Sequence, residues 1–366
     1  MALDTKASRR SHHPCAHGRA WLPVVLLLVV LVAGLAGCSA EEPVEPEPET
    51  DVAAGPPAEG PAEPVGPVWQ EQVSGVSDKL YDVVFVDPDT GWAVGGDGRG
   101  VILGTTDGGM TWAEVYTHDD YALNAVHFID AQTGWAVYQG DGESDIVKTT
   151  DGGQAWEKQT SGAVRSPNDI CFADADHGWI VTSAGQIWAT ADGGTTWEQQ
   201  ESGVEGLANH LYDLHFVDAQ TGWAVGWDGD GAIVATTDGG DTWTRQDPVV
   251  EFPKVIFFVD AQNGWAVGQD GAVATTDGGQ TWSAQDAGRR TLEDVFFADD
   301  QNGWAVGAGS IILATVDGGA TWNQERDGGA GTPVLYGVHF LDAEHGWVVG
   351  DDGVVLHYGI PEGTDG

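Results

Sequence analysis

The chain has 366 residues, with 57 acidic side chains against 14 basic ones and a formal net charge of −43. So negative a surface repels phosphate, which argues against a nucleic-acid partner. Three cysteines are too few for a disulfide framework. The 54 Gly and 17 Trp, beside only two Met, indicate many short strands and tight turns.

The amino-terminal segment, residues 1–37, is typical of a bacterial export signal. Basic residues precede an apolar run over residues 21–35, which is shorter than the roughly 20 residues of a membrane span. The run leads into the sequence LAGC, which ends at Cys38 and resembles the lipobox of bacterial lipoproteins. That resemblance implies cleavage before Cys38, its acylation, and an extracytoplasmic protein held on a bacterial membrane. The Arg pair at residues 9–10 leaves Sec and twin-arginine export both open.

The next segment, residues 38–67, is predicted to be a lipidated Cys followed by a disordered tether. After Cys38 it contains eight prolines and eight acidic residues, with no basic or aromatic side chain. A segment of this composition cannot bury enough apolar surface to fold. We therefore expect one folded domain over residues 68–359 and a short tail over 360–366.

A repeat with a period of 39 to 44 residues fills that domain. Each copy has a Phe, an Asp two residues later, and a Gly-Trp pair whose Trp follows the Asp by five residues. Apolar residues alternate around the Phe, which predicts one short buried strand per repeat. The repeated tryptophans are Trp92, Trp135, Trp179, Trp223, Trp265, Trp304 and Trp347.

A second motif, Thr-x-Asp-Gly-Gly-x-x-Trp, follows in each of the first six repeats. Asp-Gly-Gly between two β-rich stretches predicts a hairpin, because Gly supplies the positive φ of the turn. A catalytic carboxylate pair would be unique and convergent, whereas these residues occur once per repeat, so we expect a structural role. They are Asp107, Asp151, Asp192, Asp238, Asp277 and Asp317.

The seventh repeat ends near Tyr358 without this hairpin. Residues 68–75 supply the missing piece, because their sequence VWQEQVSG matches TWEQQESG at residues 196–203. An amino-terminal strand that completes the last sheet closes a ring and leaves no open edge. The sequence therefore predicts an all-β, seven-bladed β-propeller with four-stranded blades, and we expect a monomer.

The two motifs together resemble the Asp-box (BNR-like) propellers, and more closely the photosystem II assembly and stability factor family. The likeness rests on the F-x-D…GW-x-V-G…DGG-x-TW pattern and covers all seven repeats. It implies a lipid-anchored or lumenal scaffold that binds folding photosystem subunits, with neither catalytic residues nor a cofactor. A basic patch serves partner binding in that family, whereas this domain has ten scattered basic residues.

Two adjacent positions vary from repeat to repeat where the innermost strand begins. We predict that they form an acidic, tyrosine-bearing channel mouth that binds a protein partner, such as a membrane complex under assembly. The alternative is that they are solvated strand starts and turn formers. An off-pattern Trp in a neighbouring loop joins the predicted site. The residues are Tyr81, Asp82, Asn168, Asp169, Tyr212, Asp213, Trp227, Glu293, Asp294 and Tyr336.

The alternative function is a carbohydrate-binding or glycosidase-like Asp-box protein. A sialidase needs three converging arginines, and the arginines of this domain include no repeat-aligned trio, so we expect no enzyme activity. Residues 141–143 and 228–231 faintly resemble calcium loops but lack a full ligand series. His127, His215 and His339 share one position of the repeat, where packing is a better explanation than a metal. The acidic charge fits either salt adaptation or a cationic partner.

Overall fold

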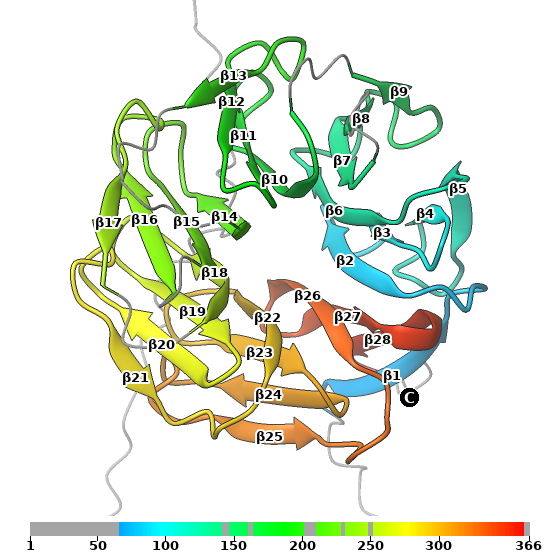
Figure 1. Ribbon diagram of the computed structural model, residues 1–366. Coiled ribbons are helices and arrows are strands. Elements are labelled where there is room, and N and C mark those ends of the chain that lie inside the picture. Colours follow the sequence, from blue (N-terminus) through cyan, green and yellow to red (C-terminus); the bar gives the residue numbers. More distant parts are fainter. Residues whose placement is uncertain are drawn as a thin grey trace, which may run out of the picture. The chain divides into compact units, whose positions relative to one another are not determined.

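The structure is a computed structural model that describes residues 66–140, 146–159, 164–200, 210–227, 231–247 and 252–361. These residues form seven antiparallel sheets of four strands each, set as blades around a central channel (Figure 1). The predicted seven-bladed propeller is confirmed. Among the residues that the structure describes, no helix has the length and apolar character needed to cross a bilayer.

Six blades each use four consecutive strands, running outward from the channel. Blade 1 consists of β2 (Leu80–Phe85), β3 (Gly91–Gly95), β4 (Gly100–Thr105) and β5 (Ala113–His118). Blade 2 consists of β6 (Leu123–Phe128), β7 (Gly134–Tyr138), β8 (Ile146–Thr149) and β9 (Glu157–Lys158). Blade 3 consists of β10 (Pro167–Phe172), β11 (Gly178–Thr182), β12 (Ile187–Thr190) and β13 (Glu198–Gln200). Blade 4 consists of β14 (His210–Phe216), β15 (Gly222–Trp227), β16 (Ala232–Thr236) and β17 (Thr244–Gln246). Blade 5 consists of β18 (Pro253–Phe258), β19 (Gly264–Gly268), β20 (Gly271–Thr275) and β21 (Ser283–Gln285). Blade 6 consists of β22 (Leu292–Phe297), β23 (Gly303–Gly307), β24 (Ile311–Thr315) and β25 (Asn323–Arg326).

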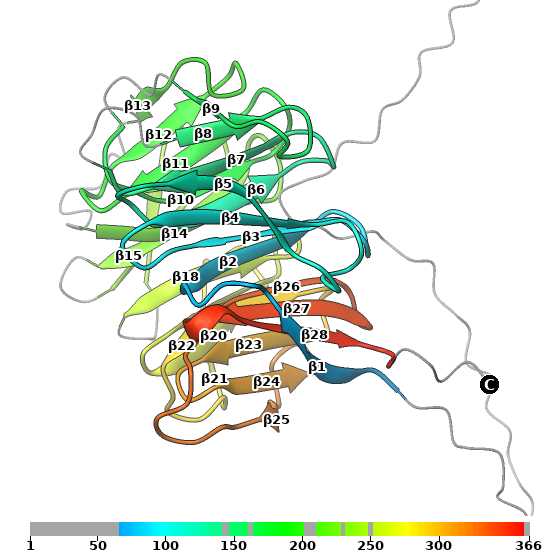
Figure 2. The same cartoon turned by 90° about the vertical axis from the view of Figure 1, so that its right-hand side faces the viewer.

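Blade 7 joins the two ends of the domain. Its inner strands are β26 (Leu335–Asp342), β27 (His345–Gly350) and β28 (Val354–Gly359), with a short 3-10 turn at Asp351–Gly353. Its outermost strand is β1 (Val68–Val73), which pairs antiparallel with β28 (Figure 2). Trp69 in β1 takes the place of the missing hairpin Trp and donates its indole N–H to Glu325 of blade 6 at 2.7 Å. The predicted closure of the ring by an amino-terminal strand is therefore confirmed.

One aromatic arrangement recurs at every junction between blades. The Phe at the end of each inner strand stacks on the Gly-Trp indole of the preceding blade, with centroids 3.5–3.6 Å apart and planes within 10°. The same Phe meets the outer Trp of its own blade edge to face at 5.8–6.0 Å. Each Phe is buried, so the stacks form the core between blades.

The glycine of each Gly-Trp pair makes this stack possible. In blade 4, a Cβ on Gly222 would lie 2.4 Å from the ring of Phe216, a distance that real Cβ atoms do not show. The corresponding glycines of the other six blades have the same close contact with their own Phe. A glycine is required before each Trp because the Phe ring packs directly against the glycine backbone of its own blade, on the side opposite the indole.

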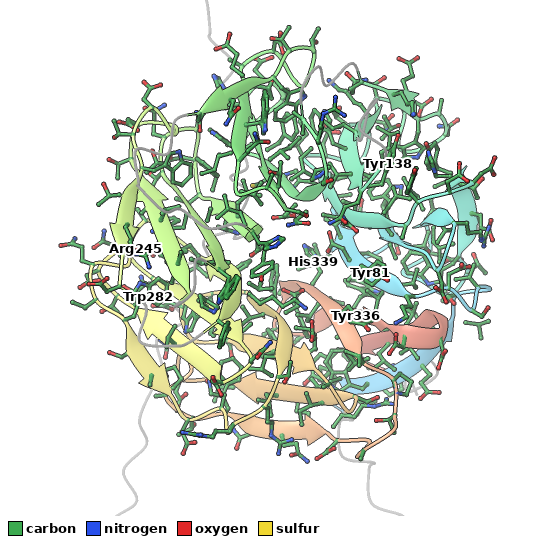
Figure 3. All side chains as sticks on the ribbon, viewed as in Figure 1. Tyr81, Tyr138, Arg245, Trp282, Tyr336 and His339 are labelled. Carbon is green, nitrogen blue, oxygen red and sulfur yellow. The ribbon has the colours of Figure 1, made fainter. Side chains whose placement is uncertain are left out.

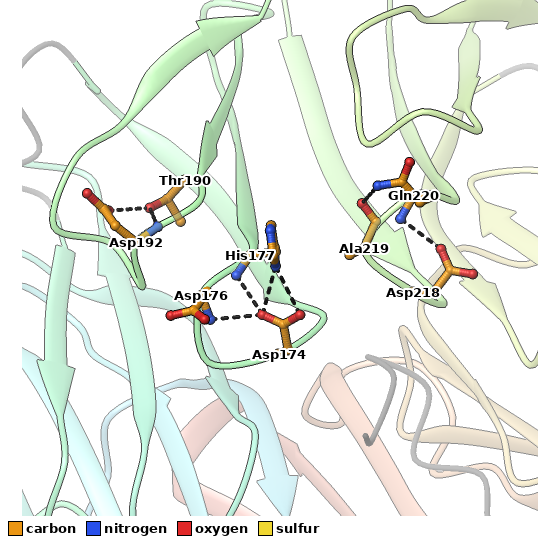
Figure 4. Close-up of polar contacts among 8 residues, drawn as sticks. All are labelled: Asp174, Asp176, His177, Thr190, Asp192, Asp218, Ala219 and Gln220. Carbon is orange, nitrogen blue, oxygen red and sulfur yellow. Dashed lines mark hydrogen bonds and ion pairs between the residues drawn. The ribbon is translucent and has the colours of Figure 1, made fainter. Parts of the chain in front are cut away.

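Each repeat has two tight turns that an Asp carboxylate stabilises, and both lie at the end of the strands opposite the channel mouth. In the first, the Asp after each inner strand accepts backbone N–H bonds from two and three residues on, as Asp174 does from Asp176 and His177 (Figure 4). In the second, the Asp of each hairpin motif accepts the hydroxyl of the preceding Thr, as Asp192 does from Thr190 at 2.9 Å. Each Asp thereby replaces backbone partners that a tight turn lacks.

The stack predicts a large loss of stability when a single ring is removed. Phe216→Ala should lower the free energy of unfolding by about 3–5 kcal/mol, because it empties the space between Trp179 and Trp243. Urea denaturation followed by Trp fluorescence measures the change. Val73→Ala is the control, since Val73 is 81% exposed and should change stability by less than about 0.5 kcal/mol. A similar small effect for both variants would contradict the role given to the stack.

Candidate functional site at the channel mouth

A cavity of about 290 Å³ opens where the seven inner strands begin. Every blade contributes to its wall, and Tyr81 and Tyr336 lie on adjoining blades beside it (Figure 3). Nine of the ten residues predicted from the sequence line this cavity: Tyr81, Asp82, Asn168, Asp169, Tyr212, Asp213, Glu293, Asp294 and Tyr336. Asn124, Ala125, Lys254 and Val255 complete the wall.

A β-bulge at the start of every inner strand explains why two consecutive residues face the cavity. In blade 1 the register shifts between Leu80 and Asp82, so Tyr81 is the extra residue. The other six blades have the same shift at the same place. In a regular strand adjacent side chains point to opposite faces, whereas a bulge redirects one of them.

Four aspartates of the mouth reach across to the next blade. The carboxylate of Asp82 accepts the backbone N–H of Val126 at 2.8 Å, and that of Asp213 accepts the N–H of Ile256 at 2.7 Å. Asp169 and Asp294 make the same contact, to Leu214 at 3.1 Å and to Val338 at 2.7 Å. These carboxyls therefore connect blades, in addition to lining the cavity.

Burial raises the pKa of all four carboxyl groups. The pKa of Asp82 rises to about 7, with the charge of Asp169 adding to the effect. The pKa of Asp169 is raised, and those of Asp213 and Asp294 are raised well above the ordinary value. At Asp213 the negative charge of Asp169 adds to the effect of burial on the pKa. The mouth is therefore less negative at neutral pH than its sequence indicates.

Amide and ion-pair contacts at the same positions also link neighbouring blades. Asn124 donates to the carbonyl of Pro167, and Asn168 donates to that of Leu211. Lys254 forms an ion pair with Glu293 of the next blade. These side chains link neighbouring blades, which gives them a structural role at the mouth. Asp, Asn and a Lys–Glu pair thus serve the same purpose at different junctions.

A tyrosine pair closes the circle between blades 7 and 1. The rings of Tyr81 and Tyr336 are 5.3 Å apart and tilted by 58°. Lys79 lies 5.8 Å from the Tyr336 ring centre and forms an ion pair with Asp351 at 3.1 Å. Asp351 also accepts the Tyr336 hydroxyl at 3.2 Å. Sequence reasoning missed Lys79 and Asp351, since both lie outside the two aligned positions.

Trp227 is the one predicted binding residue that does not line the mouth cavity. It ends β15, opposite His210 in the sheet, and is half-buried. Cys38 lies outside the described residues, as do residues 141–143 and 228–230 of the calcium-like segments.

Below the mouth lies a second, smaller cavity of about 140 Å³. The four mouth aspartates line it as well, together with aliphatic side chains, Phe257, Phe296 and the three aligned histidines. Figure 3 shows His339 directed to the channel, and His127 bonds the carbonyl of Phe172 at 3.0 Å. Within the described ranges, no group of His, Cys, Asp and Glu side chains is placed to hold a metal ion.

Four stretches of the chain match the family described as photosynthesis system II assembly factor YCF48: residues 63–163, 160–247, 205–288 and 286–359. No curated protein matches the chain. Among solved structures, YCF48 bound to a D1 peptide is similar at 23% identity and a TM-score of 0.65, over 83% of this chain and 98% of that one. YCF48 from Cyanidioschyzon merolae is similar at 23% identity and 0.64, over 80% and 98%. The GH74 enzyme of Niastella koreensis shares the fold at 14% identity and 0.61, over 79% and 53%.

The raised pKa values predict an unusual pH dependence of stability. An unfolded Asp has a pKa of about 3.9, so between that pH and about 7 the native state binds more protons than the unfolded state. Stability should therefore fall as the pH rises through this window, and the protein should be more stable at about pH 5 than at about pH 8.

Asp213→Asn separates this effect from the general repulsion of an acidic protein. The amide keeps a neutral hydrogen-bonding group, so the loss of stability between the two pH values should shrink by about 1–2 kcal/mol. Urea midpoints measured across the range give the result. The control is Asp241→Asn, an exposed hairpin position, which should keep the wild-type slope. Equal slopes for Asp213→Asn and the wild type would show that Asp213 is charged in the native protein.

Proposed function

Because this chain belongs to the family of the photosynthesis system II assembly factor YCF48, we propose that it is a non-catalytic scaffold that binds a segment of a membrane-complex subunit. The proposal places the bound segment at the channel mouth. Support comes from one observation above all: a single cavity that gathers side chains from all seven blades. A related structure of this fold holds a D1 peptide, which supports a peptide as the kind of ligand.

The chemistry of the mouth suits a peptide backbone and a neutral or basic side chain. Tyr81, Tyr212 and Tyr336 offer flat apolar faces with polar edges, which bind extended chains at low entropic cost. Burial raises the pKa of Tyr81, so its hydroxyl stays protonated as a donor. The excess of acidic residues over the whole chain disfavours an acidic segment.

The contacts of the mouth's carboxyl groups support a structural role in preference to glycoside hydrolysis. A glycosidase needs one carboxylic acid and one free carboxylate on either side of the scissile bond. Here Asp82, Asp213 and their counterparts accept backbone N–H groups of the next blade, and Glu293 is paired with Lys254. The similarity to a GH74 enzyme is one of fold, and carbohydrate binding is the alternative that the experiment below includes.

The same proposal includes an extracytoplasmic position on a bacterial membrane. Its support is the LAGC sequence ending at Cys38, followed by a Pro-rich acidic segment. An acyl chain on Cys38 would hold the domain near membrane subunits, because anchoring raises the local concentration of a ligand in the same membrane.

Binding at the mouth is tested by removing aromatic faces without breaking the carboxyl links. Tyr81→Ala with Tyr212→Ala should abolish capture of one membrane complex in mild in-cell cross-linking followed by mass spectrometry. Asp82 and Asp213 are left intact because their loss would also disconnect blades. Met110→Ala is the control, since Met110 is 58% exposed on a hairpin away from the mouth. Capture unaffected by the Tyr variant would refute the mouth as the site, and saturable binding in a glycan screen would favour the carbohydrate alternative.

Lipid attachment is tested separately by metabolic labelling with a radioactive fatty acid. The wild-type protein should carry label and sediment with membranes, whereas Cys38→Ser should lose both properties. Label retained by Cys38→Ser would contradict acylation at that residue.

A further inference from the structure

The end of the propeller opposite the mouth has grooves between the hairpins of neighbouring blades. The groove between blades 4 and 5, called groove 4–5, has a volume of about 300 Å³. The groove between blades 1 and 2, called groove 1–2, has about 690 Å³, more than twice as much. Because both are built from the same repeat, the difference must come from particular side chains.

Every lining residue of groove 4–5 has a counterpart in groove 1–2, which adds Trp112 and Gly153 and has smaller side chains at three of the shared positions. Gly104 replaces Ala235, and Ala113 replaces Thr244. The third difference is Val115, which stands three residues after the hairpin Trp, where blade 4 has Gln246. Each replacement removes atoms from the same space, and the third also removes a carboxamide.

Three of the five repeats that keep this Gln use its carboxamide to reach the next hairpin, whereas Gln159 and Gln285 donate to the carbonyl two residues before them. Gln246 donates to the carbonyl of Gly278, the first glycine of the next hairpin, at 3.1 Å. Gln72 and Gln200 make the equivalent bond to Gly108 at 2.9 Å and to Gly239 at 3.0 Å. Between blades 2 and 3, Lys148 takes this role and donates to Gly193 at 2.8 Å.

The same glycine carbonyl also accepts the indole N–H of the Gly-Trp pair from the preceding blade. Trp223 donates to Gly278 at 3.0 Å, and the tryptophans at 135, 179, 265 and 347 make the corresponding bond at 2.9–3.2 Å. In groove 1–2 the corresponding pair is Trp92 and Gly152. Among the described residues no bond between Trp92 and Gly152 corresponds to these, and Val115 has no polar group that could donate to the Gly152 carbonyl in the place of Gln246.

Groove 1–2 therefore combines extra volume with a glycine carbonyl that lacks the side-chain donor found in grooves 3–4 and 4–5. The indole N–H of Trp156 is buried beside Gly153 without a partner, as are those of Trp112, Trp197, Trp282 and Trp322 in other blades. A primary carboxamide matches this arrangement, because its N–H₂ donates to a carbonyl while its oxygen accepts from an indole. In groove 3–4 of the same protein, Gln200 does both, since its oxygen lies 3.4 Å from the Trp243 nitrogen.

We propose that groove 1–2 binds a Gln or Asn side chain of a partner protein, which occupies the place that Gln246 fills in groove 4–5. Residues 1–65 and 362–366 contain no Asn or Gln, so these terminal segments cannot supply the carboxamide. The carboxylate of Asp151, on the wall of the groove, disfavours Glu or Asp at the same place. This site is independent of the mouth, from which it is separated by the length of the blade strands.

The test uses the indole N–H signals of the protein in solution NMR. The probe is N-acetyl-glutamine methylamide, and N-acetyl-glutamate methylamide is the matched comparison. The Trp92 signal, identified by its loss in Trp92→Phe, should shift saturably with the Gln probe. Binding of the Glu probe should be about tenfold weaker or more, because it cannot donate to the Gly152 carbonyl. No saturable shift, or equal responses to both probes, would overturn the proposal.

Two reciprocal variants make the result specific to the groove. Val115→Gln with Gly104→Ala introduces the blade 4 residues and should abolish the response of Trp92. Gln246→Val empties the equivalent place in groove 4–5 and should make the Trp223 signal respond to the Gln probe. If Val115→Gln with Gly104→Ala does not fold, Gln246→Val still tests the proposal. A Trp223 signal that does not respond to the Gln probe in that variant would contradict the fit of a carboxamide. Tyr81→Ala with Tyr212→Ala should keep the Trp92 response, which distinguishes failure of this site from failure of the mouth.

Discussion

The propeller depends on the stacking of each inner-strand Phe between a glycine of its own blade and an indole of the preceding blade. Seven such stacks with nearly equal spacing set how far and at what angle each blade lies from the next. A Cβ on the glycine would overlap the ring, so the spacing cannot change without losing the contact. Because dispersion falls steeply with distance, one displaced ring weakens two sheets at once.

With blade spacing set by these stacks, the starts of the inner strands are free to differ in chemistry. The mouth uses that freedom for carboxyl, amide, ion-pair and aromatic links, each between two neighbouring blades. Its wall is consequently preorganised, because the side chains that face a ligand are already held by the next blade. Raised pKa values at Asp213 and Asp294 also mean that formal charge overstates the negative potential there.

Most of the fold could be predicted from the sequence. The Phe, Gly and Trp of each repeat are the residues that form the stack between blades, and the sequence VWQEQV at residues 68–73 identifies the closing strand. The location of nine mouth residues could also be predicted from their shared alignment position. Their bonds could not, since the bulge that turns both Tyr81 and Asp82 to the cavity has no signature in residue type. Groove 1–2 was not predicted, because it differs from the other grooves only in lacking the larger side chains of the repeat at Gly104 and Val115.

The pairing of β1 with β28 has a consequence for how the chain acquires its structure. Val68 is paired with Gly359, so the first strand to be synthesised must wait for the last before it has a partner. Until then Trp69 and the backbone of β1 are exposed, and closing so long a loop carries an entropic cost that local hairpins avoid. Blades 1 to 6 can each form as their four strands emerge, whereas the seventh completes the molecule in one late step. Until that step the folding chain is an open arc with two unpaired sheet edges, the state in which it is most exposed to aggregation.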